Sequence, residues 1–160
     1  MLLYLVQHAE AKAEQEDPSR GLSEKGLNDI KKTARHAARL SIRVGRIVHS
    51  GKKRALQTAQ VLAEQLHPDG GVSESDGLAP MDEPAIWVER LSTAGEDIMI
   101  VGHLPHLGKF SALLVCGDEN KKAVNFIMAG IVCISRDNDR SWAIDWVLNP
   151  AQLLERIQGV

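Results

Sequence analysis

The chain has 160 residues, of which 44% are hydrophobic and 25% charged, so its length and composition predict one globular domain over residues 1–160. Its formal net charge of −2 excludes the strongly positive surface that typically binds nucleic acid or an anionic membrane. The longest apolar stretch, residues 126–134, is too short to span a bilayer.

The first forty residues predict a strand, a loop and a helix. Residues 2–6 are apolar, as in a buried strand, and residues 9–21 are polar and contain Pro18 and Gly21, as in a loop. Ser23 is a suitable N-cap for a helix that continues to about residue 40 with apolar side chains at helical spacing.

The remaining elements continue this alternation of strands and helices. Residues 72–83 show no regular pattern and are expected to be irregular. We predict strands over residues 46–49 and 97–101, helices over residues 55–66, 84–93, 107–115 and 150–157, and a hairpin that pairs residues 126–135 with 141–147.

Strands that alternate with helices over the first 115 residues indicate an α/β fold. The predicted architecture is a three-layer sandwich: a largely parallel central sheet, helices on both faces, and a C-terminal antiparallel hairpin. The two cysteines, Cys116 and Cys133, lie in apolar segments without C-x-x-C spacing, and the N-terminus lacks a basic region followed by a long apolar run. These features favour reduced core thiols in a cytoplasmic protein.

Candidate catalytic residues follow three of the predicted strands. Gln7 and His8 follow the first strand, Arg54 begins the helix after the second, and His103 follows the third. Because ligands of open α/β sheets bind at the carboxyl ends of the strands, we expect these residues to meet at one edge. Taken singly, each is as well explained as an ordinary polar residue at a strand end or on a helix surface.

Together these residue types suit phosphoryl transfer. The nitrogen of a neutral imidazole is a nucleophile for phosphorus, and an arginine with a second histidine can neutralise phosphoryl oxygens. Zinc binding is the alternative, since His8, His103 and His106 could supply three nitrogens. Pro105 interrupts the pair formed by His103 and His106, and no carboxylate has a suitable spacing, so we do not expect a metal.

Four stretches of the sequence resemble the signature segments of the histidine phosphatase superfamily, in its phosphoglycerate-mutase-like branch. They are LVQHAEA, RGLSEKG, SGKKRALQTA and VGHLPHLG, which are similar to the family's L-V-R-H-G-E, R-P-L-S-x-x-G, S-x-x-x-R-A-x-Q-T-A and G-H-x-P. The short chain is most similar to the SixA-type phosphohistidine phosphatases.

The resemblance implies a protein that uses no metal and no organic cofactor, and it implies a role for each of the pocket residues. His8 would be the nucleophile that is transiently phosphorylated, and Arg54 and His103 would bind the phosphoryl group together with Gln7. The family's usual arginine and glycine on either side of the nucleophile are replaced here by Gln7 and Ala9. Gln7 donates hydrogen bonds without a charge, which predicts weakened rather than abolished catalysis.

Two further sets of residues bear on that expectation. The cations that could restore charge at the rim of the pocket are Arg20, Lys52 and Lys53. Larger family members use a glutamate as general acid, and the candidates for that role in this chain are Glu74, Asp76, Asp82 and Glu83. None of the four has a diagnostic spacing, and a solvated acidic loop explains them equally well.

The function predicted from the sequence is therefore a metal-independent phosphatase that acts through a phosphohistidine intermediate, on protein phosphohistidine. Two alternatives stay open: a small-molecule phosphomonoesterase, and a catalytically weak module that binds a phosphate or a phosphoprotein. The expected partner is a phosphohistidine-containing protein or a small phosphorylated substrate, and the sequence indicates no oligomeric state.

Overall fold

The structure, a computed structural model, describes residues 1–153 and contains a six-stranded mixed sheet with the strand order β3-β2-β4-β1-β5-β6. The strands are β1 (Leu2–Gln7), β2 (Arg46–His49), β3 (Val72–Glu74), β4 (Ile98–Gly102), β5 (Ile131–Arg136) and β6 (Trp142–Leu148). The first four are parallel, and β5 and β6 extend the sheet with antiparallel pairing. The predicted α/β architecture with a C-terminal antiparallel hairpin is confirmed.

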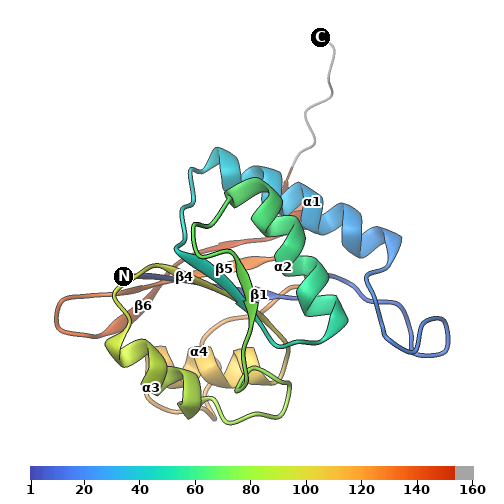
Figure 1. The fold of residues 1–160 in the computed structure, drawn as a ribbon. Coiled ribbons are helices and arrows are strands. Elements are labelled where there is room, and N and C mark those ends of the chain that lie inside the picture. Colours follow the sequence, from blue (N-terminus) through green and yellow to red (C-terminus); the bar gives the residue numbers. More distant parts are fainter. Residues whose placement is uncertain (154–160) are drawn as a thin grey trace.

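Helices cover both faces of the sheet. They are α1 (Glu24–Arg39), α2 (Lys53–Leu66), α3 (Ala85–Thr93) and α4 (His106–Cys116). Figure 1 shows α1 and α2 on one face and α3 and α4 on the other. Strand β1 lies between the two helical layers, so its side chains alternate between them. Leu3 and Leu5 pack with α3 and α4, and Tyr4 and Val6 pack with α1 and α2.

The segment after β1 is fastened to the N-terminus of α1. The Ser23 hydroxyl caps the helix by accepting a hydrogen bond from the Gly26 N–H at 3.0 Å, and it donates to the Glu10 carboxylate at 2.7 Å. A Cβ at Gly26 would collide with the backbone of Glu10, so only glycine permits this close approach. The glycine of the RGLSEKG stretch therefore holds the loop that begins with His8 against α1.

Two of the predicted elements differ from the structure. Residues 72–83 are not wholly irregular, because Val72–Glu74 forms the short edge strand β3. It was missed because only three residues pair with β2, and two of them are exposed and polar. Strand β5 begins at Ile131 rather than at residue 126, because a turn closed by a hydrogen bond from Gly130 N–H to Ile127 C=O precedes it.

The predictions for the C-terminal part need a further correction. Cys133 is buried as expected, but Cys116, the last residue of α4, is exposed and is not a core thiol. The predicted helix over residues 150–157 is observed as a short 3-10 helix, Pro150–Gln152, and its second half lies outside the described residues. Within residues 1–153, no helix has both the length and the apolar character that a bilayer span requires.

Candidate active site

His8 lies where β1 ends at the carboxyl edge of the sheet. Its backbone N–H donates to the Gly102 carbonyl of β4 at 3.0 Å, which continues the parallel pairing of Gln7 with Gly102 by one more hydrogen bond. Ala9 is fully buried and its N–H donates to the Thr58 hydroxyl of α2 at 3.0 Å. The backbone on both sides of His8 is thus anchored to other elements, so the ring is presented from a fixed position.

The His8 ring has a defined tautomer. Its Nδ1 lies 2.7 Å from the backbone carbonyl oxygen of Ala9. A carbonyl oxygen only accepts hydrogen bonds, so Nδ1 must carry the proton. In the neutral ring the lone pair is then on Nε2, which is the nitrogen available for attack on phosphorus.

Arg54 occupies the first turn of α2, and the SGKKRALQTA motif explains how this turn is held. The Thr58 hydroxyl donates to the Arg54 carbonyl at 2.7 Å while it accepts the Ala9 N–H. Gln57 accepts the Leu22 N–H at 2.7 Å, which ties the same helix to the loop before α1. Thr58 therefore joins the first turn of α2, which carries Arg54, directly to Ala9.

His103 follows β4 and faces His8. The two ring centroids are 5.0 Å apart with an interplanar angle of 50°. The Nε2 atom of His103 is 2.5 Å from the Ser50 hydroxyl oxygen, which belongs to the loop between β2 and α2. No role for Ser50 was predicted from the sequence, although it is the first residue of the SGKKRALQTA segment.

The charges of the pocket follow from its burial. Burial lowers the pKa of His8, with Arg54 and Arg20 lowering it further while the hydrogen bond to Ala9 opposes the shift. Burial, then His8 and Arg54, lowers the pKa of His103 to about 3. Both imidazoles are therefore neutral at pH 7, so His8 has the protonation state that a nucleophile needs.

These shifts predict a pH dependence of stability. The histidines stay neutral in the folded state but are protonated in the unfolded state once the pH falls below the ordinary histidine pKa of about 6.5. The unfolded state then binds more protons, so the free energy of unfolding should fall with pH below about 6.5, by up to about 1.4 kcal/mol per pH unit for each such histidine. Urea unfolding at pH 7, 6 and 5 measures this, and a flat profile would contradict it.

With this geometry in place, comparisons with known proteins identify the family. The family model described as "Histidine phosphatase superfamily (branch 1)" matches residues 3–84, the segment that carries His8 and Arg54. The chain belongs to the histidine phosphatase superfamily. An uncharacterized protein of Picosynechococcus sp. is 32% identical over 140 residues, which cover 82% of this chain and 83% of that protein.

Solved structures of this superfamily share the fold at low sequence identity. The protein histidine phosphatase SixA complexed with tungstate has a TM-score of 0.84 at 19% identity and covers 96% of this chain and 100% of its own. A phosphoserine phosphatase mutant from Entamoeba histolytica in complex with phosphoserine has a TM-score of 0.72 at 16% identity, covering 96% and 99%. Family membership and these neighbours support a phosphatase.

Gln7 occupies the position of the family's usual arginine, and its side chain, like those of Arg54 and His103, has a buried polar atom without a partner among residues 1–153. Its carbonyl oxygen Oε1 is buried and, within residues 1–153, has no hydrogen-bond partner. The backbone carbonyl of Gln7 accepts the Ala129 N–H at 3.0 Å, which brings the exposed Met128 beside the pocket. This oxygen needs a donor, which phosphoryl oxygens do not supply, so the group of Gln7 that could bond a phosphate is its amide NH2.

The four carboxylates considered as the family's general acid lie apart from the histidine pair. Asp76 pairs with Arg90 at 2.9 Å, and Asp82 accepts the Ala79 N–H at 2.9 Å. Glu83 is exposed next to α3, and Glu74 lies against Gly51. In the part of the chain that the structure describes, none of the four forms a hydrogen bond or ion pair with His8, Arg54 or His103.

The remaining histidines near this edge have other surroundings. His49 is buried and accepts the Gly51 N–H on Nδ1 at 3.0 Å, so it shapes the loop that presents Ser50. His106 is fully buried and stacks on Phe110 with ring centroids 5.8 Å apart. The described residues contain no group of three or more histidine, cysteine or acidic side chains that could hold a metal ion.

Proposed function

We propose that this protein is a metal-independent phosphatase that acts through a phosphohistidine intermediate on His8. The observation that carries the proposal is the hydrogen bond from His8 Nδ1 to the Ala9 carbonyl, which leaves Nε2 unprotonated opposite the His103 ring. Arg54 adds a guanidinium to the same pocket, and its Nε is buried without a partner within residues 1–153. An oxyanion would satisfy that donor.

The reaction then has two steps. In the first, His8 Nε2 forms a bond to phosphorus and the bond from phosphorus to the substrate's imidazole nitrogen breaks. That imidazole is protonated on its other nitrogen in the substrate, so it leaves as the neutral ring without taking up a further proton. In the second, water attacks the phosphorus, the bond to Nε2 breaks, and inorganic phosphate leaves with neutral His8 restored. Arg54 and His103 stabilise the equatorial oxygens in both steps.

The absence of a placed acid supports phosphohistidine as the substrate. None of the four candidate carboxylates forms a hydrogen bond or ion pair with the three pocket residues in the described part of the chain, so no side chain is assigned to protonate an alkoxide. A protonated imidazole is a better leaving group than an alkoxide and needs no such acid.

The rim of the pocket supports a protein as the carrier of that phosphohistidine. Leu104, directly after His103, is 43% exposed, and Ile127 and Met128 beside Gln7 are each 40% exposed. Apolar side chains gathered around a catalytic pocket are typical of a surface that contacts a protein. We therefore propose a phosphohistidine-containing protein as partner, and the free thiols of Cys116 and Cys133 are consistent with a cytoplasmic location.

Two other functions are distinguished by one experiment. The protein is incubated with a phosphohistidine-bearing protein and, separately, with p-nitrophenyl phosphate, and acid-labile phosphate on the enzyme is followed. We expect phosphate to be released from the phosphohistidine protein faster than from p-nitrophenyl phosphate. Both rates should be unchanged after dialysis of the enzyme against EDTA. Preference for the small ester would indicate a phosphomonoesterase, phosphate binding without turnover would indicate a binding module, and loss of activity in EDTA would refute metal independence.

Replacing Gln7 by arginine tests its proposed role as a phosphate-binding residue. A charge-assisted hydrogen bond contributes about 1.5–3 kcal/mol against about 1 kcal/mol for a neutral one, so Gln7→Arg should tighten inhibition by inorganic phosphate about tenfold. The inhibition constant and the melting temperature are measured together. If the melting temperature falls while phosphate inhibition does not tighten, the new guanidinium is buried away from the phosphate and Gln7 has no role there.

A further inference from the structure

A groove opens beside the active-site pocket, between the N-terminal end of α4 and residues 119–126. Its volume is about 410 Å³, and we call it the α4 groove. Leu104 lines this groove and directly follows His103, so the groove begins where the pocket ends. Phe126 lines it from the second segment and directly precedes Ile127, one of the exposed residues of the rim. A protein whose phosphohistidine enters the pocket would therefore also cover the α4 groove.

Part of the groove surface is apolar. Four side chains supply this part: Leu104, Pro105, Val124 and Phe126. An apolar side chain that packs against them loses its contact with water, and this loss is the main driving force of most protein association. The α4 groove therefore suits an occupant that presents an apolar side chain.

The charged side chains of the groove are mostly basic. Three lysines and one glutamate line it, which gives a net charge of +2: Lys109, Lys121, Lys122 and Glu119. The Lys109 ammonium group lies 3.8 Å from the Glu119 carboxylate, so these two charges offset each other. Lys121 and Lys122 are exposed and form no ion pair within residues 1–153. Because the whole chain has a formal net charge of −2, this local excess of positive charge favours an acidic occupant.

A glycine that the fold does not require lies in the same groove. Gly108 is in the first turn of α4, where glycine favours the helix less than alanine does. A Cβ at this position would meet only the Leu104 side chain, at 3.7 Å, which is an ordinary contact. Neither close packing nor a left-handed backbone therefore explains the glycine. Its effect is to leave the helix surface bare beside Leu104, where an occupant can approach the backbone.

We propose that the α4 groove binds an acidic segment of the partner phosphoprotein, close to the phosphohistidine that enters the pocket. An apolar side chain of that segment packs over Gly108 between Leu104 and Phe126, and its carboxylates pair with Lys121 and Lys122. Exposed ion pairs are individually weak, so the selectivity comes from two of them acting together with the apolar contact. The inference rests on the proposed function for the phosphohistidine, but binding of the acidic segment does not require turnover.

The test compares two fluorescein-labelled peptides by fluorescence polarisation with the full chain. In the first peptide, leucine and two glutamates flank a histidine on each side, and in the second, serines replace the glutamates. We expect the acidic peptide to bind about tenfold more tightly at low salt, and this difference should shrink as salt is added. When both peptides are phosphorylated on histidine, kcat/KM should differ by a similar factor.

Variants of the groove locate the binding. Lys121→Glu combined with Lys122→Glu reverses two charges, and Gly108→Leu fills the groove. Each should remove the preference for the acidic peptide and leave the turnover of p-nitrophenyl phosphate, which does not occupy the groove, unchanged. Gly108→Ala favours the helix as leucine does but adds a single methyl group, so it should keep most of the preference. The melting temperature of neither Gly108 variant should fall.

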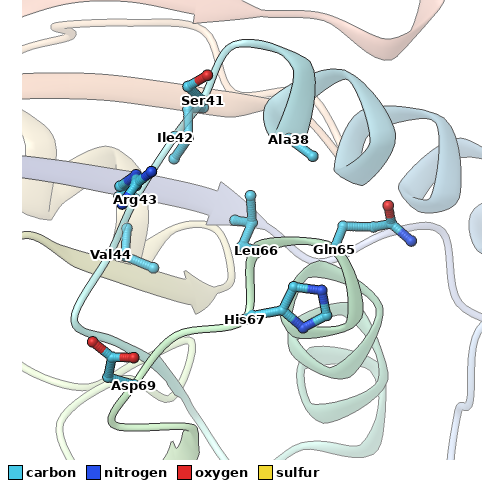
Figure 2. A pocket seen from close by; sticks show the side chains of 9 residues that line it. All are labelled: Ala38, Ser41, Ile42, Arg43, Val44, Gln65, Leu66, His67 and Asp69. Carbon is cyan, nitrogen blue, oxygen red and sulfur yellow. The ribbon is translucent and has the colours of Figure 1, made fainter.

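The matched control for the charge reversal is Lys31→Glu combined with Arg43→Glu, which changes the net charge equally. Lys31 is exposed on α1, and the exposed Arg43 lines an open pocket at the C-terminal ends of α1 and α2 (Figure 2). Both lie on the layer of the sheet opposite α4 (Figure 1). This protein should keep the full preference for the acidic peptide.

Three results would overturn the proposal: equal affinity for the two peptides, a preference that survives in the groove variants, or an equal loss in the control. Binding of the acidic peptide without hydrolysis of its phosphorylated form would instead contradict the proposed function, and it would leave the groove assignment supported.

Discussion

Replacing His8 by alanine is expected to lower kcat/KM by about a thousandfold or more, which corresponds to about 4 kcal/mol of transition-state stabilisation. The reason is that Nε2 of His8 is the atom that bonds phosphorus in the proposed reaction. The His8→Ala protein should also carry no acid-labile phosphate after incubation with substrate. Steady-state kinetics and phosphoenzyme trapping measure the two effects.

A control separates the loss of the nucleophile from a loss of fold. Within residues 1–153 the His8 ring makes one hydrogen bond, to Ala9, so its removal should change the free energy of unfolding by about 1 kcal/mol. His36→Ala, in the last turn of α1, removes an imidazole away from the carboxyl edge of the sheet and should keep full activity. Near-normal turnover in a folded His8→Ala protein would show that another residue is the nucleophile.

Replacing Arg54 by lysine is expected to lower kcat/KM about a hundredfold even though the charge is kept. A guanidinium donates through a planar fork that fits two phosphoryl oxygens at once, whereas an ammonium group is a point charge on a flexible chain. Removing one well-placed donor from such a site typically costs about a hundredfold to a thousandfold in rate. The dissociation constant of inorganic phosphate should rise in parallel.

The control for Arg54→Lys is Gln60→Ala, an exposed substitution two turns along the same helix. It should leave both kcat/KM and phosphate binding unchanged. An Arg54→Lys protein with unaltered phosphate affinity would remove Arg54 from the proposed pocket. Equal losses in the Gln60 variant would point to a disturbed helix instead.

The sequence predicted the strands that are buried on both faces and the site residues that directly follow those strands. Strand β1 was recognisable because both of its faces are buried, so it is apolar throughout, and His8 follows where that run ends. Strand β3 was not recognisable, because an edge strand of three residues with Ser73 and Glu74 exposed has no apolar pattern. Its existence depends on pairing with β2, which only the folded chain provides.

The same distinction applies to the site: residues placed by local sequence pattern were predicted, and residues placed by contacts with distant parts of the chain were not. The positions of His8, Arg54 and His103 follow from strand ends, which a hydrophobic pattern reveals. The roles of Thr58 and Ser50 do not, because each depends on a contact with a residue about fifty positions away. The position of Arg20 depends likewise on how the loop before α1 bonds to α2.

The pocket residues and the rim side chains lie on different segments of the chain, and this separation affects how such a protein can acquire selectivity for a new partner. His8, Arg54 and His103 are held by β1, α2 and β4, whereas two of the three exposed apolar side chains at the rim, Ile127 and Met128, come from the connection between α4 and β5. That connection, residues 117–130, touches the pocket residues mainly through the backbone of Gln7. Evolution or a designer could therefore exchange this surface segment, and with it the choice of partner, while the reactive groups keep their arrangement.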